Sequence, residues 1–276
     1  MKTAFLGDEY SHTYAACKVF CGEKTECIGY RTAREVAEAA ANGECDMCVL
    51  PVENSVEGSV TSTADVLLDF PLFIRAETAR AVHHGFIVKE GATLADIREV
   101  YSHPQALAQC AKWLAGNVGS AEQIAVHSTS RALKLLDTKE KAAVAAMPAR
   151  GQKELFSHIE DYASNATRFL LLSTRVADSG DRASVIFAAK NRPGGLLSVL
   201  KVFEVCGMNM TYIQSRPSKS GLGDYIFFVD FTLPEGNEAA SLERLLVLLG
   251  EWTSFCKFLG RYYHINNSEA TDNLWD

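Results

Sequence analysis

The sequence predicts an α/β protein built from two successive parts. Residues 1–177 alternate short apolar strands with helices, a pattern typical of an α/β sheet. After a polar linker at 178–182, residues 183–265 follow the ferredoxin-like order βαββαβ. Polar side chains gather at strand ends in both halves of the first part, which favours a ligand cleft between two lobes.

Local signals support the individual elements. Thr32, with Glu35 three residues later, forms a capping-box pattern that starts a helix, and Pro104 suits the first turn of another. The strands at 72–79 and 84–88 are expected to cross between the lobes, with His83 and His84 pointing to opposite sides. Other strands of the first part are expected at 3–6, 46–52, 99–102, 124–126 and 142–146, and helices at 15–20, 32–41, 59–68, from Pro104, near Ser128 and near Pro148. In the second part, strands are expected at 183–189, 208–215, 224–232 and 254–259, helices at 194–205 and 238–249, and a polar tail at 266–276.

Composition excludes several classes of protein. The chain has 276 residues, enough for two cores, and its net charge of -7 without a basic stripe argues against a nucleic-acid partner. The N-terminus turns acidic before a signal-peptide core could form, and no apolar run approaches the ~18 residues that span a bilayer. A cytoplasmic protein with no membrane partner is expected.

Eight cysteines are the unusual feature of the composition. Cys45 and Cys48 have the CxxC spacing of a zinc or redox site, but no second CxxC pair or histidine-rich segment lies nearby. Cys48 also belongs to an apolar strand, where a small buried side chain is expected. The favoured interpretation is therefore reduced structural thiols and no metal.

Hydroxyl and amide side chains recur where a strand ends and a helix begins. Helix capping alone would explain any one of them, because Ser, Thr and Asn are common N-caps. Several such positions in both halves favour a cleft that holds an anion. The positions are Ser11, Asn54, Ser55, Ser102, Ser128 and Thr129.

Three motifs in order resemble those of one enzyme family. Residues 165–169 read Asn-Ala-Thr-Arg-Phe, residues 51–60 form a polar run after an apolar strand, and residues 213–217 read Ile-Gln-Ser-Arg-Pro. They resemble the motifs of prephenate dehydratase with a C-terminal ACT domain, over nearly the whole chain. The resemblance implies a two-lobed, periplasmic-binding-protein-like catalytic domain at 1–177 and an ACT domain at 183–265.

The resemblance also implies a substrate and catalytic residues. Prephenate carries two carboxylates, and its C4 hydroxyl leaves as the ring carboxylate departs as carbon dioxide. Catalytic roles are expected for Thr167, which would donate a hydrogen bond to that hydroxyl, for Arg168, which would hold a carboxylate, and for Phe169. Substrate-binding roles are expected for Ser11, Thr13, Asn54, Ser55, Gln105, Ser128 and Thr129. No cofactor is expected, and the chain has no G-x-G-x-x-G, P-loop or H-E-x-x-H pattern.

The first family motif departs from its usual form. The family usually has Gly-Pro-x-Gly followed by a hydroxyl, an aromatic and a hydroxyl residue, whereas here Asp8, Tyr10 and His12 replace the proline, the glycine and the aromatic. Gly7, Ser11 and Thr13 still match in the unshifted alignment. An alignment with a shifted loop, which places Tyr10 and Ser11 on the aromatic–hydroxyl pair, is the alternative.

The second part resembles a phenylalanine-sensing ACT domain. Residues 191–197 resemble the family loop N-x-P-G-A-L, and Gln214 stands where the family usually has glutamate. Such domains bind L-phenylalanine between two copies, so a homodimer or homotetramer is expected. The expected regulatory residues are Gly194, Gly195, Leu196, Asn209, Gln214, Ser215, Arg216 and Pro217.

Two other functions stay open at this point. Arogenate dehydratase has the same fold and chemistry on a substrate with an amino group in place of the keto oxygen. A non-catalytic sensor of aromatic amino acids is the alternative from another class, and the intact Thr167–Arg168–Phe169 run argues against it.

Overall fold

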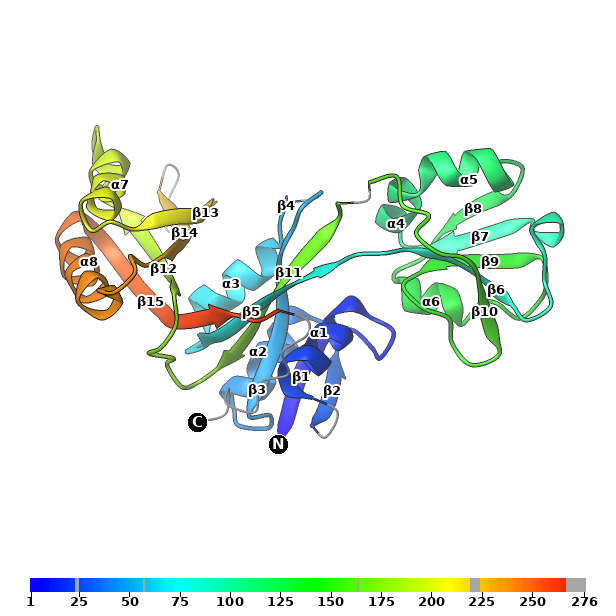
Figure 1. Ribbon diagram of the computed structural model, residues 1–276, viewed down its shortest axis with the longest axis horizontal. Helices are drawn as coiled ribbons and strands as arrows, with labels where there is room; N and C mark the ends of the chain where they lie inside the picture. The colour runs from blue at the N-terminus through cyan, green and yellow to red at the C-terminus, as the bar shows by residue number, and fades with distance from the viewer. Residues whose placement is uncertain (23–24, 57, 163, 219–223, 267–276) are drawn as a thin grey trace.

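The computed structural model describes residues 1–22, 25–56, 58–162, 164–218 and 224–266, so the predicted tail lies outside the described residues except for Asn266. Among these residues, ten strands form one long sheet and five form a second sheet (Figure 1). No helix in the described part of the chain is long and apolar enough to cross a membrane. The strands are β1 Lys2–Leu6, β2 Glu26–Tyr30, β3 Met47–Asn54, β4 Gly58–Ser59, β5 Phe73–Ala81, β6 Gly85–Lys89, β7 Glu99–Ser102, β8 Glu122–Ala125, β9 Lys141–Ala145, β10 Gln152–Phe156, β11 Ala166–Ser173, β12 Arg182–Ala189, β13 Asn209–Pro217, β14 Tyr225–Thr232 and β15 Thr253–His264. The helices are α1 His12–Cys21, α2 Ala33–Ala41, α3 Thr61–Asp69, the 3-10 turn η1 Leu94–Asp96, α4 Pro104–Gln109, α5 Ala111–Val118, α6 Thr129–Leu133, α7 Gly195–Val205 and α8 Glu238–Trp252.

The first lobe is a sheet with helices on both faces. Its strands lie in the order β2-β1-β3-β11-β5, and β3 and β11 are apolar because both of their faces are covered. Leu170 and Leu172 pack against α2 and α3, whereas Phe169 and Leu171 pack against α1. The capping box at the start of α2 is confirmed, since Thr32 and Glu35 each bond the other's backbone.

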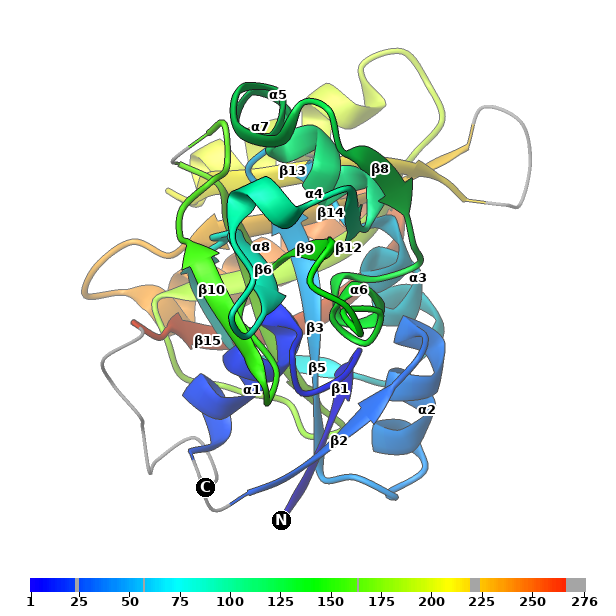
Figure 2. The ribbon, with the colours of Figure 1, turned by 90° about the vertical axis from the view of Figure 1, so that its right-hand side faces the viewer.

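The second lobe is the five-stranded sheet β10-β6-β9-β7-β8, with α4 and α5 on one face and α6 on the other (Figure 2). The prediction of a helix near Pro148 is wrong. Gly151 adopts the left-handed conformation (φ 80°) and turns the chain into β10, which pairs antiparallel with β6. Strand β2 was missed, because its five residues lack a continuous apolar run.

Two segments join the lobes. The chain passes from β5 to β6 through residues 82–84 and returns from β10 to β11 through residues 157–165 (Figure 1). His84 is 4% exposed and His83 only half-buried, so the expected in-and-out pair is confirmed.

Residues 182–264 follow the βαββαβ order, with the strands arranged β13-β14-β12-β15 and with α7 and α8 over one face. The other face packs on the first lobe, where Ile186 and Phe228 join the same core as Leu67 and Ile74. Strand β15 was predicted to end at residue 259. It continues to His264 and pairs with β5, so the two parts share one continuous sheet.

Candidate active site

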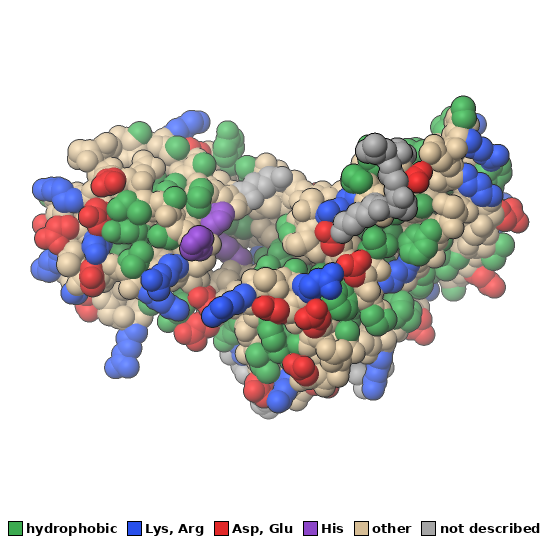
Figure 3. Space-filling model, turned by 180° about the vertical axis from the view of Figure 1, so that it is seen from behind, with side chains coloured by type: hydrophobic (Ala, Val, Ile, Leu, Met, Phe, Trp, Pro, Cys, Tyr) green, Lys and Arg blue, Asp and Glu red, His purple; other side chains and the backbone are tan. Residues whose placement is uncertain are grey.

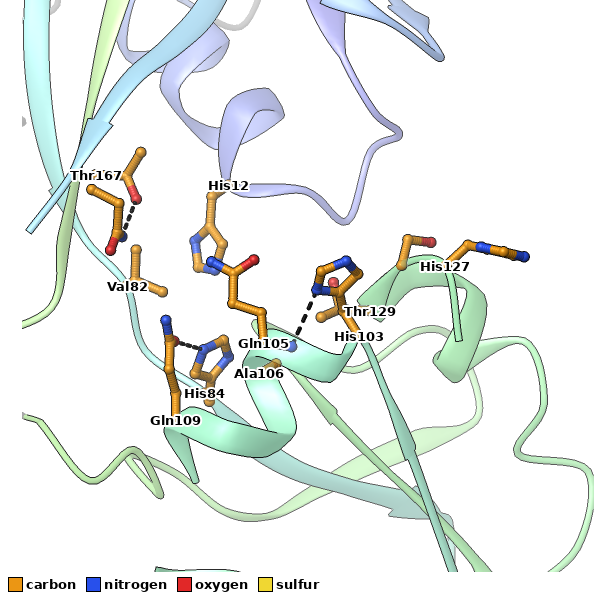
Figure 4. A pocket seen from close by; sticks show the side chains of 12 residues that line it. His12, Val82, His84, His103, Gln105, Ala106, Gln109, His127, Thr129 and Thr167 are labelled. Carbon is orange, nitrogen blue, oxygen red and sulfur yellow. Dashed lines mark hydrogen bonds between the residues drawn. The ribbon is translucent and has the colours of Figure 1, made fainter. Parts of the chain in front are cut away.

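A cleft of about 300 Å³ lies between the two lobes (Figure 4). The first lobe contributes side chains from α1, β3 and β11, and the second contributes α4, the segment before α6 and the first residue of α6. The lining residues are His12, Asn54, Val82, His84, His103, Gln105, Ala106, Gln109, His127, Ser128, Thr129 and Thr167.

Thr167 lies at the start of β11, directly opposite Asn54 at the end of β3. Asn54 Nδ2 donates to Thr167 Oγ1 at 2.9 Å and to Asn165 Oδ1 at 2.8 Å. Because the threonine oxygen accepts this bond, the hydroxyl is oriented and its own proton can be donated to a ligand.

The hydrogen bonds continue into the second lobe. Gln109 Oε1 accepts from Asn165 Nδ2 at 3.0 Å and from His84 Nε2 at 2.9 Å. This arrangement makes His84 the Nε2–H tautomer, and its buried Nδ1 has no hydrogen-bond partner among the described residues. One polar chain therefore runs across the hinge from Thr167 to His84.

His12 faces His84 across the cleft, with 6.2 Å between the ring centroids. Burial, followed by the nearby charges of His84 and Arg80, lowers the pKa of His12 to about 4. Burial also lowers the pKa of His84, against its bond to Gln109 and the charge of Glu160. His12 is therefore neutral at pH 7 and can donate or accept hydrogen bonds.

The second-lobe wall is built on two short helices. His103 Nδ1 accepts from the backbone N–H of Gln105 at 3.4 Å and so caps α4, which begins at Pro104 as predicted. Ser128 Oγ accepts from the N–H of Arg131 at 3.0 Å and caps α6. The structure brings the predicted residues Gln105, Ser128 and Thr129 into the cleft together with Asn54 and Thr167.

Three predicted substrate-binding residues do not line the cleft. Ser11 caps α1 by accepting from the N–H of Tyr14 at 3.1 Å, and Thr13 is buried within that helix. Ser55 Oγ accepts from the N–H of Ala166 and donates to the carbonyl of Ser164, so it fastens β3 to the entry of β11. These contacts give all three a structural role.

Arg168 does not reach the cleft, contrary to the expectation that it would hold a substrate carboxylate. It follows Thr167 in the strand and therefore points to the opposite face of the sheet. Its guanidinium donates to Glu77 at 2.8 Å and to Glu53 at 3.2 Å, forms an ion pair with Asp230 at 2.6 Å, and lies 5.0 Å from the ring centre of Tyr212. Arg168 thus joins the first lobe to β13 and β14.

Phe169 is likewise removed from the reacting groups. Its side chain is 1% exposed and packs with Phe5, Phe20 and Val49 under α1. The apolar residue after Arg168 therefore anchors β11 in the core rather than contacting substrate.

Sequence reasoning missed His84, Gln109 and Asn165 as site residues. No local signal singled them out, because only the packing of α4 against the two segments that join the lobes brings Gln109 to His84 and Asn165. Two of the residues that differ from the usual first family motif also make contacts with the second lobe. Asp8 Oδ1 accepts from Ser130 Oγ of α6 at 2.6 Å, and Tyr10 packs against the core beneath α6.

A second groove, of about 430 Å³, lies at the start of α7, and of the predicted regulatory residues Leu196 lines it. Gly194 begins the helix at φ 78°, a conformation that favours glycine. A Cβ on Gly195 would lie 2.1 Å from the carbonyl oxygen of Lys190, so this position also requires glycine.

The remaining predicted regulatory residues lie on β13 and do not line this groove. Gln214 accepts from the hydroxyl of Tyr212 at 3.0 Å, and Arg216 bonds Asp65 of α3 at 3.0 Å, so both face the first lobe. Asn209, Ser215 and Pro217 are exposed along the strand. Within one chain, these side chains and the groove at the start of α7 therefore lie apart.

All eight cysteines are free. Cys48 is buried in the core as predicted, and Cys45 is buried beside it. Burial raises the pKa of the Cys48 thiol far above its ordinary value, which disfavours the thiolate that a metal would need.

Comparison with known proteins identifies a family. The family model described as prephenate dehydratase matches residues 3–177. The chain is 35% identical over 268 residues to a bifunctional chorismate mutase/prephenate dehydratase of Neisseria gonorrhoeae, covering 94% of this chain and 73% of that protein. It is 37% identical over 226 residues to the prephenate dehydratase of Methanocaldococcus jannaschii, covering 78% of this chain and 80% of that protein.

Solved structures agree on the fold. A prephenate dehydratase of Arthrobacter aurescens in complex with L-Phe superposes with a TM-score of 0.86 at 28% identity, over 95% of this chain and 90% of that one. A protein described as a novel type of quorum quenching acylase superposes with a TM-score of 0.84 at 26% identity, over 99% of both chains. The family match over residues 3–177, with relatives named for the same reaction, shows that this chain belongs to the prephenate dehydratase family of lyases.

Proposed function

We propose that the chain converts prephenate to phenylpyruvate, carbon dioxide and water at the cleft between the two lobes, in the cytoplasm. The observation that carries the proposal is the bond between Asn54 and Thr167, which orients the hydroxyl of the family threonine into that cleft. The eight free thiols suit a reducing compartment.

Two bonds break in the proposed reaction. The bond between C1 and the ring carboxylate breaks, and its electron pair enters the ring as carbon dioxide leaves. The C4–O bond breaks in turn, and the departing oxygen takes a proton to form water. Thr167 donates a hydrogen bond to this oxygen as negative charge develops on it, an interaction that is stronger in the transition state than in the bound substrate.

Neutral donors hold the substrate. Gln105, Ser128 and Thr129 on the second lobe and His12 on the first can each donate to a carboxylate oxygen. A neutral donor binds a carboxylate less tightly than an arginine does. Decarboxylation is therefore not suppressed by an ion pair that would favour the charged ground state.

The test compares substrates on one preparation. We expect phenylpyruvate from prephenate at a kcat/KM at least about tenfold above that for phenylalanine formation from arogenate. Acylase activity is measured in parallel, because one fold can carry unrelated activities. Preference for arogenate, or acylase activity without dehydration, would contradict the proposal.

L-Phenylalanine is proposed to inhibit the enzyme through residues 183–265, which act as an ACT regulatory domain. The support is the likeness to the Arthrobacter aurescens enzyme in complex with L-Phe and the groove that Leu196 lines. Strand β13 is an edge of the long sheet and exposes Ser215 and Pro217, so a second chain paired there would complete the site and give a dimer or tetramer.

Two exposed tyrosines give a matched test of this regulatory site. Tyr225 lines the groove, whereas Tyr263 lies on β15 outside it, and the two are 49% and 53% exposed. Tyr225→Ala is expected to weaken L-phenylalanine binding at least about fivefold in calorimetric titration, in line with the loss of an aromatic contact. Tyr263→Ala is expected to bind as wild type. Equal binding by all three proteins, or a monomer in light scattering, would contradict this site.

A further inference from the structure

His83, His158 and Glu160 meet outside the catalytic cleft. One donor atom from each lies within 4.8 Å of the other two. Glu160 Oε1 is 2.8 Å from His83 Nδ1 and 3.7 Å from His158 Nδ1. We propose that these three side chains bind a divalent transition-metal ion of the zinc class.

The distances and the donor atoms suit such an ion. Zinc binds imidazole nitrogen and carboxylate oxygen at about 2.0–2.2 Å, which places neighbouring donors of a tetrahedral site about 3.4 Å apart. The two distances to Glu160 Oε1 lie on either side of this value, so a small movement of the histidines would produce the site. Imidazole ligands favour Zn²⁺, Co²⁺, Ni²⁺ and Cu²⁺ over Mg²⁺ or Ca²⁺.

The carboxylate is already placed for binding. Glu160 is 4% exposed, and its Oε2 accepts from the backbone N–H of His84 at 2.9 Å, which turns Oε1 toward the two imidazoles. A ligand that is itself held by a further hydrogen bond is typical of metal sites. His83 and His158 are 44% and 63% exposed, so an ion can enter from solvent and water can complete its coordination.

An ion pair between His83 and Glu160 would by itself explain why these two of the three side chains lie together. It does not account for His158, the one non-glycine residue with positive φ (54°) in the described part of the chain. This left-handed conformation is uncommon for a side chain of that size. It holds the ring with its centroid 4.1 Å from that of His83, beside the same carboxylate oxygen.

The site would connect the two segments that join the lobes. His83 lies between β5 and β6, and His158 and Glu160 lie on the return from β10 to β11. Histidine side chains gather at the waist between the lobes (Figure 3). A bound ion would tie both segments together next to His84, and so stiffen the hinge beside the cleft.

The experiment titrates ZnCl₂ into chelator-treated full-length protein by calorimetry. We expect one ion per chain and, at about a hundredfold excess over Kd, a rise in melting temperature of roughly 5 °C. His158→Ala and Glu160→Gln should each weaken binding at least about tenfold while circular dichroism shows an intact fold. His127→Ala, which removes an exposed histidine outside the cluster, should bind as wild type.

The absorption spectrum of the protein loaded with Co²⁺ in place of Zn²⁺ identifies the ligands. Co²⁺ bound by histidine and carboxylate lacks the near-ultraviolet charge-transfer band of a cobalt thiolate. We expect no such band. Three results would overturn the proposal: equal zinc affinity in wild type and His158→Ala, a thiolate band that assigns the ion to cysteine, or no binding up to about 1 mM.

Discussion

Thr167 and Arg168 are neighbours in β11 but serve opposite faces of the sheet. Thr167 Oγ1 accepts from Asn54 at 2.9 Å in the cleft between the lobes, whereas Arg168 donates to Glu77 at 2.8 Å on the face that packs against β13 and β14. A displacement of Arg168 would therefore also shift β11, the strand that carries Thr167. The family motif thus combines a residue of the cleft with a residue of the contact between the two parts of the chain.

Thr167→Ala is expected to fold and to lose about 10²–10⁴-fold in kcat, because it removes a positioned hydrogen-bond donor. KM should change less than kcat, since the donor acts mainly in the transition state. Phenylpyruvate formation measures both constants. Thr167→Ser keeps the hydroxyl and should recover most of the loss, and an alanine variant with near wild-type turnover would refute the role.

Arg168→Met is expected to destabilise the protein by about 3–5 kcal/mol, because Asp230 stays buried without its cation and Glu77 loses one of its ion pairs. Urea unfolding measures the loss in the free energy of unfolding. Arg168→Lys should lose less than Arg168→Met, because lysine keeps the positive charge. At temperatures where the variant is folded, KM for prephenate should stay within about threefold of wild type. A stable variant with a large rise in KM would return Arg168 to substrate binding.

Asp8→Ala tests the contact between the lobes that the unusual first motif provides. Its bond to Ser130 joins the two lobes, so its loss should lower kcat/KM about fivefold or more, equivalent to about 1 kcal/mol. Ser130→Ala should have a similar effect, and the double variant should be no worse than either single one. Additive losses would show that the two residues act independently.

The stability of the protein at low pH should depend on Glu77. Burial raises its pKa, but bonds and ion pairs with His264, Arg168 and Arg182 outweigh burial and lower the pKa from 4.5 to about 2. A lowered folded-state pKa means that the stabilisation, on the order of 3 kcal/mol, is fully present above pH 4.5 and is lost as the pH falls toward 2. Glu77→Gln should thus differ from wild type at pH 7 and converge with it near pH 2 in thermal unfolding. A constant difference across this range would contradict the linkage.

The sequence alone predicted the family and most of the helices and strands, because their signals are local. The Thr32 capping box, Pro104 and the apolar run after Arg168 each act within a few residues. For the same reason, polar residues at strand ends predicted Asn54, Ser128 and Thr129, which line the cleft, although Ser11 and Ser55 from the same set do not. Gln105 was expected from the family resemblance. The helix expected near Pro148 does not form, because Gly151 turns the chain into β10, and β10 pairs with β6 residues that lie 63 to 70 positions earlier in the chain.

Only the tertiary structure decided what each side chain contacts. The pairing of β11 with β3 and β5 decides to which face of the sheet Thr167 and Arg168 each point. Strands β3 and β5 come from distant parts of the chain. The packing of α4 against the segment between β5 and β6 places Gln109 beside His84, and the extension of β15 onto β5 brings His264 to Glu77. Strand register and lobe packing depend on long-range contacts, so a motif read along the chain can indicate a site residue without showing the direction in which it points.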